Sequence, residues 1–82
     1  MVAFVAPGGG VAAFVAGRRV GGAVERNRAR RVLRAAWRDV APRMQEGWDV
    51  VWVARESIRW AKTQDLVAEM EQLLSRSQVI QS

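Results

Sequence analysis

The stretch AVERNRARRVLRAAWRDVAPRM, residues 23–44, repeats its apolar side chains at the spacing of an α-helix. At about 100° per residue, these side chains gather on one arc of the helix. The apolar positions are Ala29, Val32, Leu33, Ala36 and Val40. Pro42, followed by Gly47, predicts that the helix ends or kinks near its last turn. A helix with one apolar arc must bury it against a second layer, so the neighbouring segments decide the fold.

Two short apolar segments precede this helix. They are MVAFVAP at residues 1–7 and VAAFVAGRR at residues 11–19, and Gly8, Gly9 and Gly10 separate them. Valine and phenylalanine favour strands, and a connection rich in proline and glycine favours a tight turn. The pattern therefore predicts two strands joined as a β-hairpin.

Two further segments follow the helix. The sequence WDVVWVAR at residues 48–55 alternates and is rich in valine, which predicts a third strand. Residues 63–76 predict an amphipathic closing helix, with Asp65 near its positive end. Its apolar positions are Leu66, Val67, Met70, Leu73 and Leu74. We expect at least two of the four tryptophans to fill the core and residues 77–82 to form a frayed tail.

The predicted element order is β-β-α-β-α. This order indicates an α+β fold, a two-layer α/β sandwich in which the helices pack on a small mixed sheet. A chain of 82 residues has room for one core, so we expect a single domain over residues 1–82.

Positive charge is concentrated on the long predicted helix and just before it. The whole chain carries +5, whereas residues 18–38 hold eight basic residues against Glu25 alone, a local +7 that leaves −2 elsewhere. On the helix, one arc carries Arg26, Asn27, Arg30, Arg31, Arg34 and Arg38. Like charges four residues apart destabilise a helix by a few tenths of a kcal/mol per pair, so stability does not explain this arrangement. Arginine binds phosphate in a bidentate manner, and the pattern indicates a nucleic-acid partner.

Several classes of site are not supported by the composition. Cysteine and histidine are both absent, which removes thiol nucleophiles, the usual general base and most transition-metal ligands. The acids are scattered singly, so we expect neither catalytic residues nor a metal site. They are Glu25, Asp39, Glu46, Asp49, Glu56, Asp65, Glu69 and Glu71. Apolar stretches fall well short of the roughly 20 residues that span a bilayer, so we expect no membrane association and a cytoplasmic location.

The run GRRVGGAVERNRARRVLR, residues 17–34, resembles the signature of the bacterial ribonuclease P protein. In that signature, two basic residues and a glycine precede an Arg-Asn-Arg helix with further basic positions. Downstream, GWDVVWVAR at residues 47–55 resembles the following strand of the family, which usually ends in Ala-Arg. The resemblance implies the family's fold, which is of the ribosomal protein S5 domain 2-like type.

The resemblance also implies a function. The chain would be the RNA-binding protein subunit of ribonuclease P, an endoribonuclease that removes the 5′ leader of precursor tRNA. Its partners would be the ribonuclease P RNA, which supplies the chemistry with bound divalent metal such as Mg²⁺, and precursor tRNA. The protein alone would hold no cofactor. The RNA-binding residues would be Arg18, Arg19, Arg26, Asn27, Arg28, Arg30, Arg31, Arg34 and Arg38, with Phe4 and Phe14 as candidate residues of a leader-binding cleft on the sheet.

The chain departs from this family at its start. Family members usually begin with a helix and a further strand, and this sequence starts about where their second strand would. Without those elements one sheet face and one strand edge would be uncovered, which predicts a homodimer at that surface.

Three other interpretations remain open at the level of sequence. The chain could be another basic RNA-binding module of ribosomal or ribosome-assembly type, which need not carry the Arg-Asn-Arg spacing. It could be a nuclease that acts without RNA, although its scattered acids argue against that. It could also be a shortened fragment that does not support activity.

Overall fold

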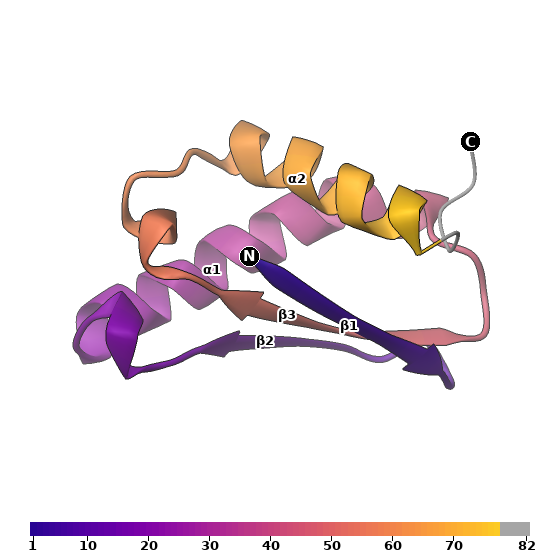
Figure 1. Cartoon of the computed structure of the whole chain (residues 1–82), viewed down its shortest axis with the longest axis horizontal. Coiled ribbons are helices and arrows are strands. Elements are labelled where there is room, and N and C mark those ends of the chain that lie inside the picture. The colour runs from indigo at the N-terminus through magenta and orange to yellow at the C-terminus, as the bar shows by residue number, and fades with distance from the viewer. Residues whose placement is uncertain (78–82) are drawn as a thin grey trace.

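The computed structural model describes residues 1–77 of the chain (Figure 1). In chain order the elements are β1 (Val2–Pro7), β2 (Ala12–Ala16), the 3-10 turn η1 (Arg18–Val20), α1 (Ala23–Val40), η2 (Ala41–Arg43), β3 (Trp48–Ala54), η3 (Glu56–Arg59) and α2 (Thr63–Arg76). The predicted order of strands and helices is confirmed. The tail expected at residues 77–82 lies outside the described residues from position 78 onward.

The sheet has the strand order β1-β3-β2, so the predicted hairpin is wrong. β3 lies between the two N-terminal strands, antiparallel to β1 and parallel to β2. The strand order follows from how apolar each strand is. Val50, Trp52 and Ala54 of β3 are all buried, and a central position gives this apolar strand hydrogen-bonded neighbours on both edges. The mixed sheet that was predicted is nevertheless present.

The glycine-rich connection between β1 and β2 passes over the start of β3. Asp49 holds it there, because its Oδ1 accepts hydrogen bonds from the backbone N–H groups of Gly10 (2.9 Å) and Val11 (2.7 Å). Gly8 leaves room for the same carboxylate, since a Cβ built at Gly8 would lie 1.9 Å from Asp49 Oδ2. A connection typical of a hairpin therefore serves here as a crossing between two strands that are not neighbours.

Both helices cover the same face of the sheet (Figure 1). α1 buries Ala29, Leu33, Ala36 and Val40, four of the five positions on the predicted apolar arc, and Val32 is half-buried. α2 adds Leu66, Met70 and Leu74. The two-layer sandwich expected from the sequence is confirmed. In the part of the chain that is described, neither helix combines the length and the apolar character that a bilayer crossing requires.

The end of α1 differs from expectation, whereas the tryptophans follow it. α1 ends at Val40 rather than Met44, because Pro42 has no N–H to continue the helical hydrogen bonds, and the chain forms a 3-10 turn there. Among the tryptophans Trp52 is fully buried, and Trp37 and Trp48 are half-buried and pack against the core, as the prediction of at least two core tryptophans requires. The half-buried ring of Trp37 packs against the ring of Trp52, with the two ring centroids 5.7 Å apart.

Candidate nucleic-acid interface

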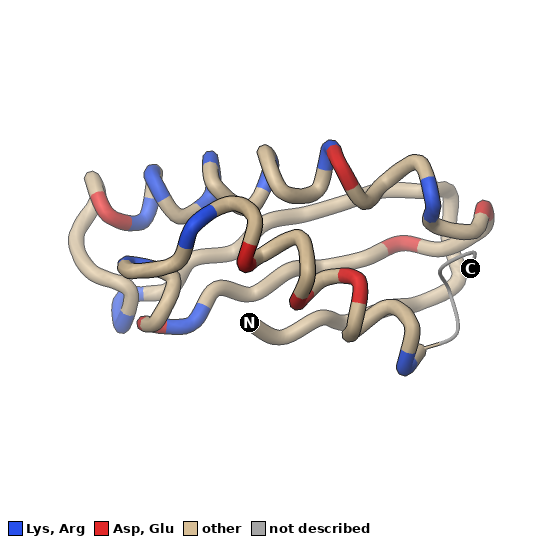
Figure 2. Tube along the Cα trace, turned by 90° about the horizontal axis from the view of Figure 1, so that it is seen from above, with Lys and Arg blue, Asp and Glu red and all other residues tan. Residues whose placement is uncertain are grey.

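The outer face of α1 is a row of cations. The buried positions of the helix lie on one side, and the opposite side exposes Asn27, Arg31, Arg34 and Arg38, while Arg26 and Arg30 are half-exposed at its margin. Figure 2 shows basic positions recurring along the whole length of the helix. We call the surface formed by Arg26, Asn27, Arg30, Arg31, Arg34 and Arg38 the arginine ridge. Its direction is a consequence of packing, because the apolar arc fixes how the helix is rotated on the sheet.

Among the acids of residues 1–77, none forms an ion pair with a guanidinium group of the ridge. Within residues 1–77 the ion pairs join the N-terminal amino group of Met1 to Glu69 at 3.0 Å and Arg43 to Glu71, and neither involves α1. Arg30 donates a hydrogen bond to Asn27 Oδ1, which orients both side chains on the surface. The ridge therefore presents charge that an external anion can bind.

The ridge also has a shape that suits a phosphate backbone. An open groove of about 480 Å³ is lined by Val24, Asn27, Arg30, Arg31 and Arg34. On the side towards β2, Cζ of Arg34 lies 5.6 Å from the centre of the Phe14 ring, a cation–π contact that limits the freedom of this guanidinium. Phosphate oxygens can approach several fixed donors at once in such a groove.

Arg18 and Arg19 extend the basic surface beyond the start of α1. Both are exposed on η1, and buried Val20 anchors that turn in the core. Gly21 makes the tight connection to the helix, with φ of 143°, and a Cβ added at Gly21 would lie only 2.8 Å from Cβ of Glu25. These two arginines therefore lie at the end of the helix where the ridge begins.

Arg28, which was predicted in the same RNA-binding set, points to the other flank of α1. It lines a separate pocket of about 210 Å³ together with Glu25, Ile58 and Arg59. Sequence reasoning missed Arg59. The run RESIRWAK at 55–62 carries three cations against one acid, and this local composition was the signal that could have found it.

Phe4 and Phe14 do not lie on one surface, which corrects their grouping as residues of a single cleft. The register pairs Phe4 with Val51 on the uncovered face of the sheet, and Phe4 is 61% exposed there. Phe14 pairs with Trp52 on the face that the helices cover, where it packs against the core. Successive side chains of a strand alternate between faces, so the face of each ring depends on a register that the sequence did not reveal.

Positive and negative side chains are concentrated on different helices. α2 carries Asp65, Glu69 and Glu71, so acids gather on the second helix while cations follow the first (Figure 2). Among residues 1–77, no group of three or more carboxylates is placed to hold a metal ion. A polyanion approaching this protein is therefore directed towards α1 and away from α2.

Comparisons with known proteins identify related sequences and a matching family model. A family model described as Ribonuclease P matches residues 5–78. A ribonuclease P protein component of Dehalococcoides mccartyi is 37% identical over 67 residues, covering 82% of this chain and 54% of that protein. One from a Roseiflexus species is 41% identical over 70 residues, covering 84% and 57%. The chain thus spans a little over half the length of these relatives.

Solved structures show the same fold at low sequence identity. The ribonuclease P protein of Staphylococcus aureus superposes with a TM-score of 0.73 at 17% identity, covering 95% of this chain and 74% of that one. The protein from Thermotoga maritima gives a TM-score of 0.72 at 21% identity, covering 90% and 74%. The small mixed sheet with two helices is therefore a known arrangement.

Proposed function

The chain belongs to the ribonuclease P protein family, and from that premise we propose that it is an RNA-binding subunit of ribonuclease P. The observation that carries the proposal is the arginine ridge, whose guanidinium groups have no acidic partner among the described ion pairs. Folded RNA offers closely spaced phosphates that match such a row. Family membership favours this function over the ribosomal or ribosome-assembly module that the sequence left open.

The chemical step in this proposal belongs to the RNA partner. Divalent metal such as Mg²⁺ is bound by the RNA subunit, which cleaves the 5′ leader from precursor tRNA in the cytoplasm. The protein contributes cations that lower the repulsion between RNA phosphates and so reduce the metal concentration needed for folding and substrate binding. Asn27 adds a donor and an acceptor for a ribose or a base edge beside these cations.

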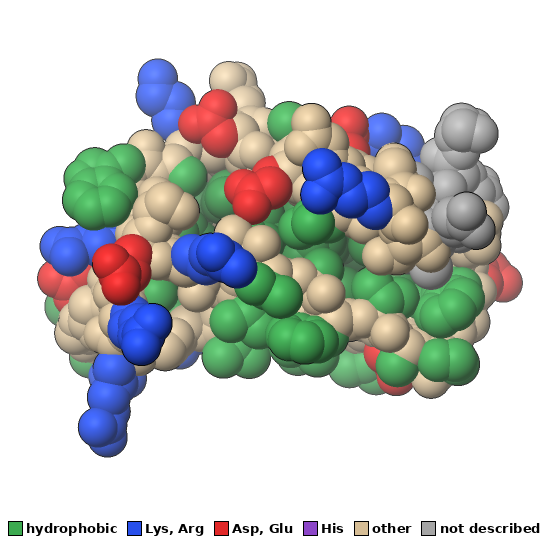
Figure 3. All heavy atoms as spheres, in the orientation of Figure 1, with side chains coloured by type: hydrophobic (Ala, Val, Ile, Leu, Met, Phe, Trp, Pro, Cys, Tyr) green, Lys and Arg blue, Asp and Glu red, His purple; other side chains and the backbone are tan. Residues whose placement is uncertain are grey.

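Two further contacts are part of the proposal. In this proposal Phe4, which is exposed on the uncovered sheet face, would contact the tRNA leader, whereas Phe14 supports Arg34 of the ridge. The same uncovered face is also a candidate for self-association, because Phe4 and Val15 are exposed there. Figure 3 shows apolar side chains gathered over the strands.

Reconstitution tests the proposal directly. Cleavage of precursor tRNA by the ribonuclease P RNA is measured at low magnesium, with and without the protein. The parent chain should stimulate cleavage, and the variant Arg26→Glu/Arg30→Glu/Arg34→Glu should not, because three phosphate contacts become repulsive.

Two controls separate charge from position. The variant Arg43→Glu/Arg76→Glu reverses charges away from the ridge and should stimulate as the parent does. The variant Arg26→Lys/Arg30→Lys/Arg34→Lys keeps the charge but loses bidentate geometry, so partial stimulation is expected. Equal stimulation by the triple glutamate variant would show that the ridge is not the docking face, and a parent chain that binds the RNA without stimulating it would be an inactive fragment.

A further inference from the structure

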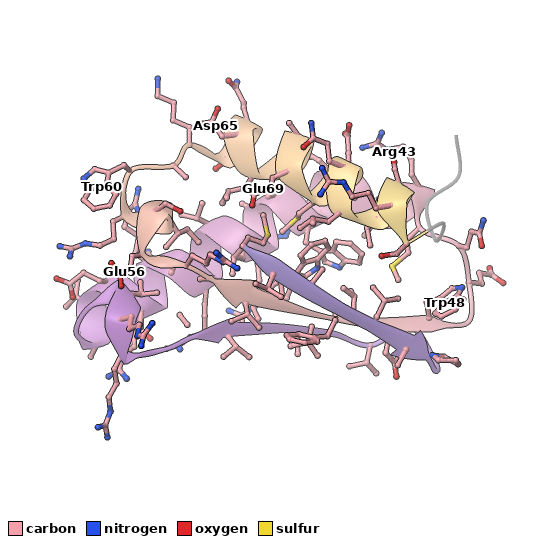
Figure 4. All side chains as sticks on the ribbon, viewed as in Figure 1. Arg43, Trp48, Glu56, Trp60, Asp65 and Glu69 are labelled. Carbon is pink, nitrogen blue, oxygen red and sulfur yellow. The ribbon has the colours of Figure 1, made fainter. Side chains whose placement is uncertain are left out.

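A second basic surface lies at the corner where η3 meets η1 and the first turns of α1. Its most prominent side chain is Trp60, which follows η3 and is 77% exposed. Figure 4 shows the ring pointing outward from the corner, away from the sheet and both helices. The other three tryptophans are buried or half-buried, so this ring is an exception that packing does not explain.

The backbone holds Trp60 in this outward position. Ile58, only two residues earlier, is 3% exposed and anchors the turn in the core. The N–H of Trp60 donates to the carbonyl oxygen of Ser57 at 3.1 Å, and that of Ala61 donates to Ile58 at 3.3 Å. Immediately afterwards the N–H of Lys62 donates to Asp65 Oδ2, which fixes the start of α2. The ring is therefore presented by a segment that is hydrogen-bonded on both sides.

Basic side chains lie beside the ring, on a turn that also carries the exposed acid Glu56. Cζ of Arg59 lies 5.8 Å from the centre of the Trp60 ring, a cation–π contact. Arg59 also lines the 210 Å³ pocket with Arg28, Ile58 and Glu25, and Glu25 is the acid that lines it. Exposed Lys62 lies two residues beyond the ring. A tryptophan used to bind protein is typically surrounded by apolar neighbours that exclude water, whereas an aromatic ring among cations is typical of sites for single-stranded nucleic acid.

We propose that Trp60, Arg59 and Arg28 form a second RNA contact, in which an unpaired base stacks on Trp60 and a neighbouring phosphate binds the two guanidinium groups. This inference rests on the proposed function. Arg28 lies on the flank of α1 opposite to Arg26 and Arg30, so the contact is distinct from that part of the arginine ridge. Arg31 lies between the two surfaces, because it lines the ridge groove and also a further pocket with Arg28. RNA bound at both surfaces would contact two sides of the N-terminal end of α1. Its phosphates would bind on one side and an unpaired base would stack on the other.

Binding of the ribonuclease P RNA to variants of the full chain tests this site. Trp60→Ala should weaken binding by about 5- to 100-fold, the range measured for loss of one stacked base, and Trp60→Phe should restore part of it. Arg59→Ala should make the negative slope of log affinity against log salt concentration shallower by about one, because one phosphate contact is lost. Trp60→Ala should leave that slope unchanged. Circular dichroism checks that each variant remains folded, and Trp48→Phe serves as the matched control.

Fluorescence locates the contact. Titration with a short oligouridylate should quench the parent chain through the exposed ring, and the quenching should be lost in Trp60→Phe but kept in Trp48→Phe. The inference is overturned if the parent binds the ribonuclease P RNA and Trp60→Ala binds it equally well, in which case the ring is free to serve a protein partner. Failure of the proposed function gives a different result. In that case the parent chain binds the ribonuclease P RNA no more tightly than the Arg26→Glu/Arg30→Glu/Arg34→Glu variant does.

Discussion

At the scale of single residues, one carboxylate determines how the two N-terminal strands are connected. Asp49 lies at the start of the central strand and accepts two backbone hydrogen bonds from Gly10 and Val11. From sequence it was one of eight scattered acids, and its role depends on a loop almost forty positions earlier, so no local pattern could reveal it. Trp60 was likewise counted among candidate core residues, because hydrophobicity alone does not say which rings a fold leaves outside.

Replacing Asp49 tests this role. Asp49→Ala should lower the free energy of unfolding by about 2 kcal/mol, because two N–H groups lose a charged acceptor. Urea denaturation followed by circular dichroism measures the change. Asp49→Asn retains one acceptor oxygen and should cost less than the alanine variant, whereas Glu46→Ala, at an exposed position just before, should cost little. Equal stabilities of Asp49→Ala and the parent would contradict the assignment.

At the scale of elements, the sequence located the main helices and strands well. α2 was predicted at residues 63–76 and is found there, and α1 differs from its prediction only after Val40. Periodicity succeeds for such elements because each one buries a face whose repeat is written locally. The arginines of the ridge also repeat at helical spacing, and their mutual repulsion lowers the stability of α1.

The variant Arg30→Glu should stabilise the protein while weakening RNA binding. In the parent, Arg30 faces Arg26 and Arg34 one turn away on either side, and both pairs are repulsive. A glutamate there makes both pairs attractive, which should raise the free energy of unfolding by about 0.5–1 kcal/mol at low salt.

Chemical denaturation at two salt concentrations measures this gain, which should shrink as salt screens the charges. Arg30→Gln removes the repulsion without adding attraction and should give about half of the gain. A loss of stability in Arg30→Glu would indicate that the hydrogen bond from Arg30 to Asn27 outweighs the repulsion.

At the scale of the whole molecule, the helices cover one face of the sheet and leave the other without a helical layer. Phe4 and Val15 project from that face with exposed fractions of 61% and 44%, and β1 and β2 are both edge strands. Exposed apolar strands without charged side chains are prone to pair with another copy. Association through this face would leave the ridge, on the opposite layer, open to the ribonuclease P RNA, but it would compete with the tRNA leader for Phe4.

Light scattering tests the association. The parent chain should form a dimer at tens of micromolar, and Phe4→Lys/Val15→Lys should be monomeric because lysines oppose burial of the face. Val24→Lys is a suitable control, since Val24 is 79% exposed on α1 and should not affect the dimer. A monomeric parent at these concentrations would count against self-association.

The sequence by itself determined the elements, the buried arc of α1 and the line of arginines opposite to it. These features follow from spacing along one helix, where residues three and four apart share a face whatever surrounds them. The tertiary structure decided the order of the strands, the separation of Phe4 from Phe14, and the meeting of Arg28 with Arg59. Each of these depends on which segments become neighbours in space, and that choice is set by the burial of β3 between two partners rather than by any local repeat.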